Sequence, residues 1–374
     1  MPAFKEDPMA GRQIANLQGL RGIAALLVVL YHAQPVLNRA YGLALDRHVG
    51  VFGVDIFFVL SGFVMVISNP RPNPAATGRF LAQRFFRIVP LYWFATAAII
   101  ACFGIGFRPV GLHHLDPWIV AQSAFFIQSS FPDGRHALIL TVGWTLMFEL
   151  FFYAALALSF PLRSIGLSVG VLAVLFVALA AIGQFGPPLP YLLDFFTAPI
   201  MLEFLYGAFL ALAYAHWSNA GPRWLAPAGL LLAATGCAIV IALDAAGVAV
   251  PNKHDLRFLL LGLPAALVVG GALAMERGRW ILRQPWLLEL GAASYVLYLF
   301  HPLVLQGSVK LVRPLFPQAP LIAGMFALLA SLVVAFVVHR IIEQPLLDWA
   351  KRLMRRRPLP DRSLPSPLAI HPAE

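Results

Sequence analysis

Charged residues and cysteines are both scarce in this 374-residue chain, and each shortage excludes a class of protein. Only 12% of the residues are charged whereas 60% are hydrophobic, and the mean hydropathy is +0.79. A soluble domain usually carries about twice that share of charge, so the composition indicates a membrane protein. The two cysteines, Cys102 and Cys237, lie inside apolar runs, which leaves no disulfide framework and no paired metal-ligand spacing.

Internal repeats are also missing, and no cleavable leader is expected. No self-similarity with a period of roughly 20 to 50 residues is visible, which excludes a solenoid. An inverted repeat of the kind that transporters use is not visible either. The first residues, MPAFKEDPMAGRQ, lead into an apolar stretch without a small-residue cleavage site. That stretch is therefore predicted to be the first membrane span and not a removed signal peptide.

Long apolar runs are what the chain has in abundance. Ten of them are long enough to cross a bilayer, so the sequence predicts an all-α polytopic membrane protein with about ten transmembrane helices. A shorter run, 118–128, is predicted to lie at the membrane interface. The predicted spans are 17–36, 51–68, 88–107, 144–160, 163–182, 197–216, 223–244, 256–275, 287–312 and 319–342.

The distribution of basic residues predicts the orientation of these spans. Of the 27 Lys and Arg residues, 19 fall in the N-terminus, the C-terminal tail and the connections from even to odd spans. The positive-inside rule then places both termini in the cytoplasm. We expect a cytoplasmic segment at 1–16, the membrane domain at 17–343, and a basic, Pro-rich, disordered tail at 344–374. The tail suits anionic lipid headgroups, and no nucleic-acid partner is expected.

Two polar residues interrupt the first span, GLRGIAALLVVLYHA. Arg21 and His32 are eleven residues apart, which in a helix is about 20° past three full turns, so both lie on one face. Their separation along the axis is about 16 Å. Between them lie Ala24, Ala25 and Val28, which are small enough to leave room along that face.

Further ionisable residues fall in the outer half of other predicted spans. The segments GVDIFFVLSGF, GWTLMFELFFY and SYVLYLFHP each carry one. A charge near the bilayer centre costs roughly 2.5–3.5 kcal/mol, so such residues usually face the bundle interior and mark function. Pro302 is expected to break or kink the helix next to His301. With His32, the members of this layer are Asp55, Glu149 and His301, and Tyr153 and Tyr298 lie within a turn of the last two.

A second, cationic layer is predicted near the cytoplasmic surface. Arg84 and Arg87, in RFFRIVPLYW, lie one turn apart at the start of the third span, at the same depth as Arg21. Three guanidinium groups around one opening suit a ligand with several phosphates, because each can bind phosphate through a fork of donors. Glu343 and Asp348, near the end of the last span, are expected to pair with neighbouring arginines.

Ordinary structural roles compete with these interpretations. The three arginines could be membrane anchors whose heads reach the lipid headgroups. A histidine inside a membrane protein is often hydrogen-bonded to a neighbouring helix, and Asp55 and Glu149 could join helices in the same way. A transporter would use the same histidine and carboxylates as a proton relay, but it would not need the arginines. A lipid or assembly scaffold would leave the ionisable layer unexplained.

Six segments, in order, resemble acyltransferase family 3, the integral membrane acyltransferases that modify O-antigens, exopolysaccharides, Nod factors and macrolides. The segments are LQGLRGIAALLVVLYHA, GVDIFFVLSGFVM, FLAQRFFRIVPLYW, GWTLMFELFFY, LGAASYVLYLFHP and the closing EQP, covering about residues 15 to 350. The resemblance implies about ten spans in a bacterial cytoplasmic membrane, a cytoplasmic acyl-CoA donor, commonly acetyl-CoA, and transfer to a hydroxyl of a sugar or other acceptor.

The resemblance also assigns residues. The family's Arg-x10-His pair falls on Arg21 and His32, its arginine pair falls on Arg84 and Arg87, and its acidic position falls on Glu149.

Acyltransferases with a His-x4-Asp motif are excluded, because none of the ten histidines has Asp five positions later. Some relatives carry an esterase-like domain after the last span; none is expected here, which leaves the acceptor's side of the membrane open.

The expected chemistry follows from these roles. Acyl-CoA has a polyanionic head, which Arg21, Arg84 and Arg87 would bind, and a long arm, which would run along the small-residue face of the first span towards His32. His32 would act as general base or as nucleophile, and the sequence does not decide which. Asp55 or Glu149 would fix its tautomer. Tyr153, Tyr298 and His301 are expected to contact substrate. No metal is expected.

Overall fold

Helices make up nearly all of the described structure. The computed structural model describes residues 14–107, 112, 114–131, 135–216, 221–248 and 254–355. Within these ranges, ten helical segments are long and apolar enough to cross a membrane. The prediction of an all-α, multi-pass membrane protein is therefore confirmed; the placement of the termini in the cytoplasm stays a prediction.

The described residues form thirteen α-helices, of which α4 alone lies outside the candidate spans, and two short strands. The first six helices are α1 (Ala15–Tyr41), α2 (Phe52–Ile67), α3 (Thr77–Gly104), α4 (Pro117–Ala124), α5 (Trp144–Leu158) and α6 (Ile165–Phe185). The others are α7 (Tyr191–Phe196), α8 (Leu202–His216), α9 (Leu225–Ala245), α10 (Leu263–Arg277), α11 (Pro285–Val312), α12 (Pro320–Val338) and α13 (Gln344–Arg355). Strands β1 (Ser129–Ser130) and β2 (His136–Ala137) pair antiparallel, with Ser129 opposite Ala137.

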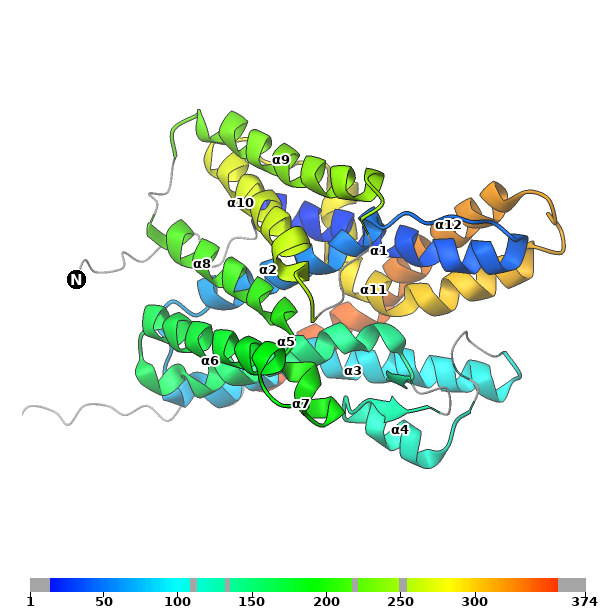
Figure 1. Ribbon diagram of the computed structural model, residues 1–374, viewed down its shortest axis with the longest axis horizontal. Helices are drawn as coiled ribbons and strands as arrows, with labels where there is room; N and C mark the ends of the chain where they lie inside the picture. The colour runs from blue at the N-terminus through cyan, green and yellow to red at the C-terminus, as the bar shows by residue number, and fades with distance from the viewer. Residues whose placement is uncertain are drawn as a thin grey trace, which may run out of the picture.

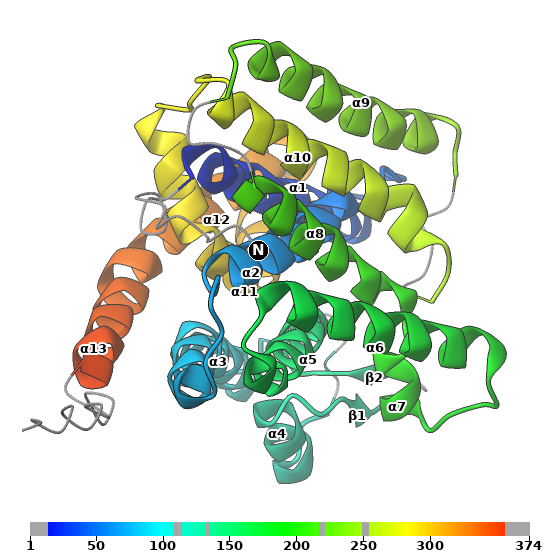
Figure 2. The ribbon, with the colours of Figure 1, turned by 90° about the vertical axis from the view of Figure 1, so that its left-hand side faces the viewer.

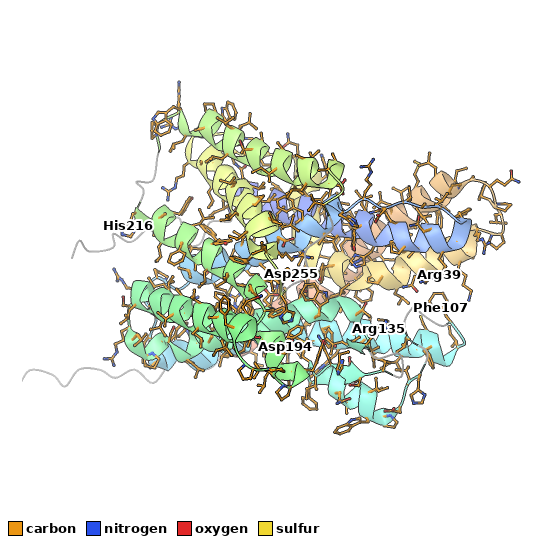
Figure 3. All side chains as sticks on the ribbon, viewed as in Figure 1. Arg39, Phe107, Arg135, Asp194, His216 and Asp255 are labelled. Atoms are coloured by element: carbon orange, nitrogen blue, oxygen red, sulfur yellow. The ribbon has the colours of Figure 1, made fainter. Side chains whose placement is uncertain are left out.

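The helices form three groups across the bundle. In Figures 1 and 2, α1, α2 and α11 lie in the middle, α9 and α10 lie on one flank, and α3, α5 and α6 lie on the other. The short interfacial segment predicted at 118–128 corresponds to α4, which lies beside β1 and β2 at the edge of the α3 flank. Arg39, in the last turn of α1, and Phe107, which follows the third span, lie at one end of the molecule, and His216, which ends the sixth span, lies at the other (Figure 3).

Close helix crossings hold the central group together. Helices α1 and α11 pack along much of their length, as do α2 and α8. At Gly291 the α11 backbone lies so close to the Gln18 carbonyl of α1 that a side chain there would collide with it. Small residues at such crossings let two helix backbones approach, and the van der Waals contacts that result stabilise helix association inside a membrane.

Three expectations about helix limits are wrong. The third span begins at Thr77 and not near 88, so Arg84 and Arg87 lie two turns inside α3. Helix α11 continues past Pro302, so the expected break is wrong, while a kink at this position stays a prediction. The predicted disordered tail begins with a helix: α12 passes through a π-helical turn, His339–Glu343, into α13, while 356–374 lie outside the described residues. The Trp349 ring of α13 packs on Phe86 of α3, an anchor that composition alone did not reveal.

Candidate active site

A cavity lies among α2, α3, α5 and α11, and α1 contributes one side chain to it. Its empty space is about 870 Å³, counting the part that opens to solvent. Six of the nine predicted site residues line this cavity, and they come from four helices. These six are Arg21, Arg84, Arg87, Glu149, Tyr153 and Tyr298.

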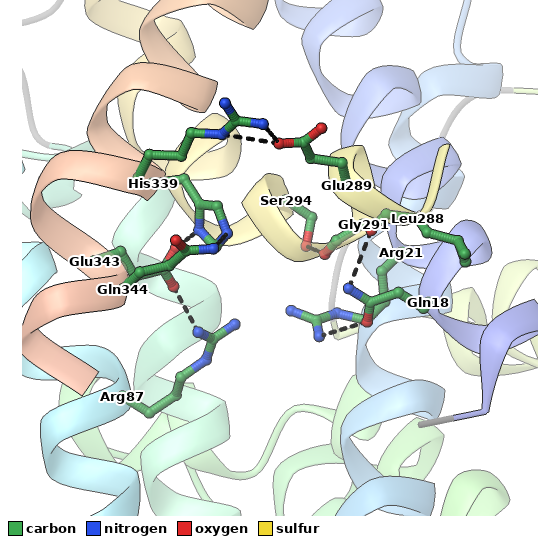
Figure 4. Close-up of polar contacts among 11 residues, drawn as sticks. Gln18, Arg21, Arg87, Leu288, Glu289, Gly291, Ser294, His339, Glu343 and Gln344 are labelled. Carbon is green, nitrogen blue, oxygen red and sulfur yellow. Dashed lines mark hydrogen bonds and ion pairs between the residues drawn. The ribbon is translucent and has the colours of Figure 1, made fainter. Parts of the chain in front are cut away.

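The three arginines gather in this cavity as predicted, but they are not equivalent. Arg87 forms an ion pair with Glu343, with 2.5 Å between Nη1 and Oε1. Glu343 is in turn held by the His339 ring. The pairing expected for Glu343 is thus confirmed, whereas Asp348 pairs with Lys351 and not with an arginine. Figure 4 shows the guanidinium groups of Arg87 and Arg21 pointing towards one another.

Arg21 and Arg84 have no carboxylate partner among the described residues. Arg21 Nη1 donates a long hydrogen bond, of 3.5 Å, to the Gln18 Oε1. The Arg84 guanidinium lies 5.7 Å from the Phe80 ring centre and 5.8 Å from that of Tyr153, and its buried Nε has no hydrogen-bond partner. A cation removed from water without a counter-ion costs free energy, and a bound anion would lower that cost. This end of the cavity is therefore suited to binding an anion.

Glu149 lies deeper in the same cavity. Its Oε1 accepts hydrogen bonds from the Ser61 hydroxyl, at 2.9 Å, and from the Tyr153 hydroxyl. At the far end, the Thr145 and Tyr298 hydroxyls lie 2.8 Å apart, and both donate towards the Val142 carbonyl. The cavity is therefore cationic at one end and carries neutral hydroxyls at the other.

The two predicted histidines lie next to each other, beyond the lining of this cavity. The His301 ring centre is 4.9 Å from that of His32 and 6.0 Å from that of Tyr298, which lines the cavity. His32 Nδ1 lies 2.9 Å from the Val28 carbonyl, and His301 Nδ1 lies 3.1 Å from the Leu297 carbonyl. Because a carbonyl only accepts, each neutral ring carries its proton on Nδ1 and keeps a free lone pair on Nε2. The buried His301 Nε2 has no partner in the described structure.

Two expectations about His32 need correction. Neither carboxylate fixes its tautomer, since the Val28 carbonyl does so and Asp55 is bound elsewhere. The small-residue face of α1 is not an open path either. Ala24 and Val28 are fully covered by α2, whose Gly53 approaches so closely that a Cβ there would lie 2.9 Å from the Val28 Cγ2. The open path is instead the cavity on the other side of α2.

Asp55 belongs to a separate buried cluster. Both of its oxygens accept hydrogen bonds of 2.8 Å from Arg257, which lies just before the π-helical turn Phe258–Gly262. Glu203 of α8 is also fully buried, and neither of its oxygens has a hydrogen-bond partner in the described structure. Neither Arg257 nor Glu203 was predicted from the sequence as a site residue. Glu203 is the one acidic residue in the predicted span 197–216, so the reasoning that selected Asp55 also applied to it.

Comparison with known proteins identifies the family. The family model described as "Acyltransferase domain" matches residues 14–340, nearly all of the chain. The chain belongs to this acyltransferase family. The exopolysaccharide production protein ExoZ of Rhizobium meliloti is 34% identical over 309 residues, covering 80% of this chain and 90% of ExoZ. Acyltransferase MdmB of Streptomyces mycarofaciens is 29% identical over 93% of this chain and 94% of its own.

A third relative is the membrane-bound transacylase BcsY of Komagataeibacter xylinus, described as putative, which is 27% identical over 90% of this chain and 84% of its own. No solved structure matches the chain. The resemblance of the six sequence segments to membrane acyltransferases is thus confirmed, and the protein is an acyl-transferring enzyme of a multi-pass membrane family.

Proposed function

We propose that this protein is an O-acyltransferase of the bacterial cytoplasmic membrane that moves an acyl group, in the simplest case acetyl, from cytoplasmic acyl-CoA to a hydroxyl of a sugar or glycan. The observation that carries the proposal is the pair of half-buried cations, Arg21 and Arg84, which face a cavity without a carboxylate partner in the described structure. The relative named for exopolysaccharide production supports a saccharide acceptor.

The geometry fits the shape of the donor. The phosphates of CoA would bind Arg21 and Arg84, and Arg87 would join them if Glu343 released it. Glu149 lies further in and would repel phosphate, so the polyanionic head would stop at the arginines while the neutral arm extends past Tyr153 towards Tyr298. Arg21 and His32 are separated by about 16 Å along α1, a distance that such an arm spans.

In the transfer step, His32 is the proposed general base. Its free Nε2 takes the proton of the acceptor hydroxyl while that oxygen attacks the thioester carbonyl carbon. The carbon–sulfur bond then breaks, the acyl group stays on the acceptor oxygen, and the imidazolium returns its proton to the CoA thiolate. His301 lies beside His32, and Tyr298 lies beside His301; both are proposed to hold the acceptor. Asp55 is proposed to act at a distance by holding Arg257 in place.

Donor binding tests this proposal. Acetyl-CoA is titrated into the purified protein in detergent, and affinity is measured by calorimetry for the wild type, Arg21→Gln and Arg84→Gln. Each substitution removes a charge-assisted contact worth about 1.5–3 kcal/mol, so affinity should fall about 10- to 150-fold. The control is Arg340→Gln, because Arg340 pairs with Glu289 on the exposed surface and does not line the cavity. A wild type that does not bind acetyl-CoA would refute the donor site and favour the transporter.

A further inference from the structure

A second large hollow lies on the other side of α1 and α2 from the active-site cavity, and no residue lines both. We define this groove by its walls, which come from α1, α2, α9, α10 and the loop between α10 and α11. Its empty space is about 1460 Å³, including the part that opens outward. It is independent of the proposed active site.

The walls of the groove are those of a site for a hydrocarbon chain. Along α1 they extend from Gly19 to Leu27, about 12 Å at 1.5 Å per residue. The side chains there are apolar, and the two amides on the wall, Asn16 and Gln284, are both at the end formed by the α10–α11 loop. Because the groove lies at the depth of membrane-spanning helices, an acyl chain suits it and water does not.

The loop at that end carries the features of a headgroup site. Trp280 lines the groove, is 53% exposed and is typical of the membrane interface. The exposed Arg279 and Arg283 flank the groove-lining residues of the loop, and the structure gives neither an ion pair among the described residues. Asn16 fixes the loop: its side chain donates to the Trp280 carbonyl at 2.8 Å and accepts from the Leu282 amide at 2.7 Å.

Arg279 also occupies a position where arginine is unfavourable for the backbone. Its φ of 73° lies in the left-handed region, at the end of α10, where glycine is the preferred residue. Arg279 directly precedes Trp280, the first groove-lining residue of the loop. Basic residues at the cytoplasmic surface attract anionic lipid, and the predicted orientation places this loop on that side.

We propose that the groove binds one membrane phospholipid with an anionic headgroup, its acyl chain lying against α1, α9 and α10 and its phosphate beside Arg279 and Arg283. The occupant is thus a lipid that stays with the protein and lies apart from the acyl donor and acceptor. Each arginine is expected to favour an anionic over a zwitterionic headgroup by about fivefold.

Native mass spectrometry of the full chain, delipidated in detergent and then given either phosphatidylglycerol or phosphatidylcholine, tests the proposal. The wild type should retain phosphatidylglycerol preferentially, and Arg279→Gly should lower that preference about fivefold while relieving the backbone. The matched control is Arg163→Gly, which removes another exposed arginine with positive φ, of 54°, far along the chain from the groove. Equal retention of both lipids by the wild type, or an unchanged preference in Arg279→Gly, would overturn the headgroup assignment.

Filling the groove tests the position of the acyl chain. Cys237 of α9 lines the groove with an exposed side chain, whereas the neighbouring Ala238 is exposed and does not line it. Cys237→Phe should lower the retention of both lipids at least fivefold, and Ala238→Phe should leave it unchanged. If both substitutions leave retention at the wild-type level, the lipid binds elsewhere and the proposal is wrong.

Discussion

At the scale of single residues, His32 carries the chemistry of the proposed reaction. Its Nδ1 is bound to the Val28 carbonyl, which leaves Nε2 free to take a proton. His32→Gln removes that base while keeping a polar side chain, so turnover should fall about 10²- to 10⁴-fold. The affinity for acetyl-CoA should not change, because Arg21 lies about 16 Å away along α1 and Arg84 lies on another helix, α3. Transfer assays with labelled acetyl-CoA, beside calorimetry on the same samples, measure both; unchanged turnover would remove His32 from the mechanism.

Glu149 is predicted to act through its negative charge, which limits how deep the phosphates travel. Glu149→Gln keeps the size and the hydrogen bonds to Ser61 and Tyr153 but loses the charge. Acetyl-CoA should then bind as tightly as in the wild type or more tightly, while turnover falls about tenfold because the acyl end is misplaced. Steady-state kinetics separate the two effects. Weaker binding with normal turnover would show that Glu149 does not act in this way; Ser61→Ala, which keeps the charge, is the control.

At the scale of helices, the ion pair between Asp55 and Arg257 connects α2 to the start of the eighth span. Both side chains are buried, so Asp55→Asn leaves Arg257 without its counter-charge. Breaking a buried pair from one side typically costs about 3–5 kcal/mol. Asp55→Asn should therefore lower the melting temperature strongly, and the double variant Asp55→Asn with Arg257→Gln should recover part of the loss. A stable but inactive Asp55→Asn would instead support the catalytic role that the sequence predicted for Asp55.

Helix positions were easier to predict than helix neighbours. Hydropathy located all ten spans, and lone ionisable residues inside them located the charged residues of the cavity lining, because both signals are local. Which helices pack together is not local. No local pattern indicated that Arg257, some 200 positions from Asp55, would bind it, or that His301 would lie against His32. The polar first turns of α3 were not predicted as helix, because hydropathy does not distinguish a polar helix from a loop.

At the scale of the whole molecule, the two hollows divide the protein by chemistry. The cavity between α2, α3, α5 and α11 is lined by cations and hydroxyls, and the groove between α1, α9 and α10 is apolar. The central pair α1 and α2 separates them (Figure 1). We therefore propose that a polyanionic donor binds in the first and a lipid in the second.

Cryo-electron microscopy of the full chain with a non-hydrolysable acetyl-CoA analogue tests that claim most directly. We predict density for the phosphates of the analogue between Arg21 and Arg84. Its arm should pass Tyr153 and Glu149, and its acyl end should lie beside Tyr298. Density for the analogue at the apolar groove, or a cavity that stays empty at saturating analogue, would contradict it.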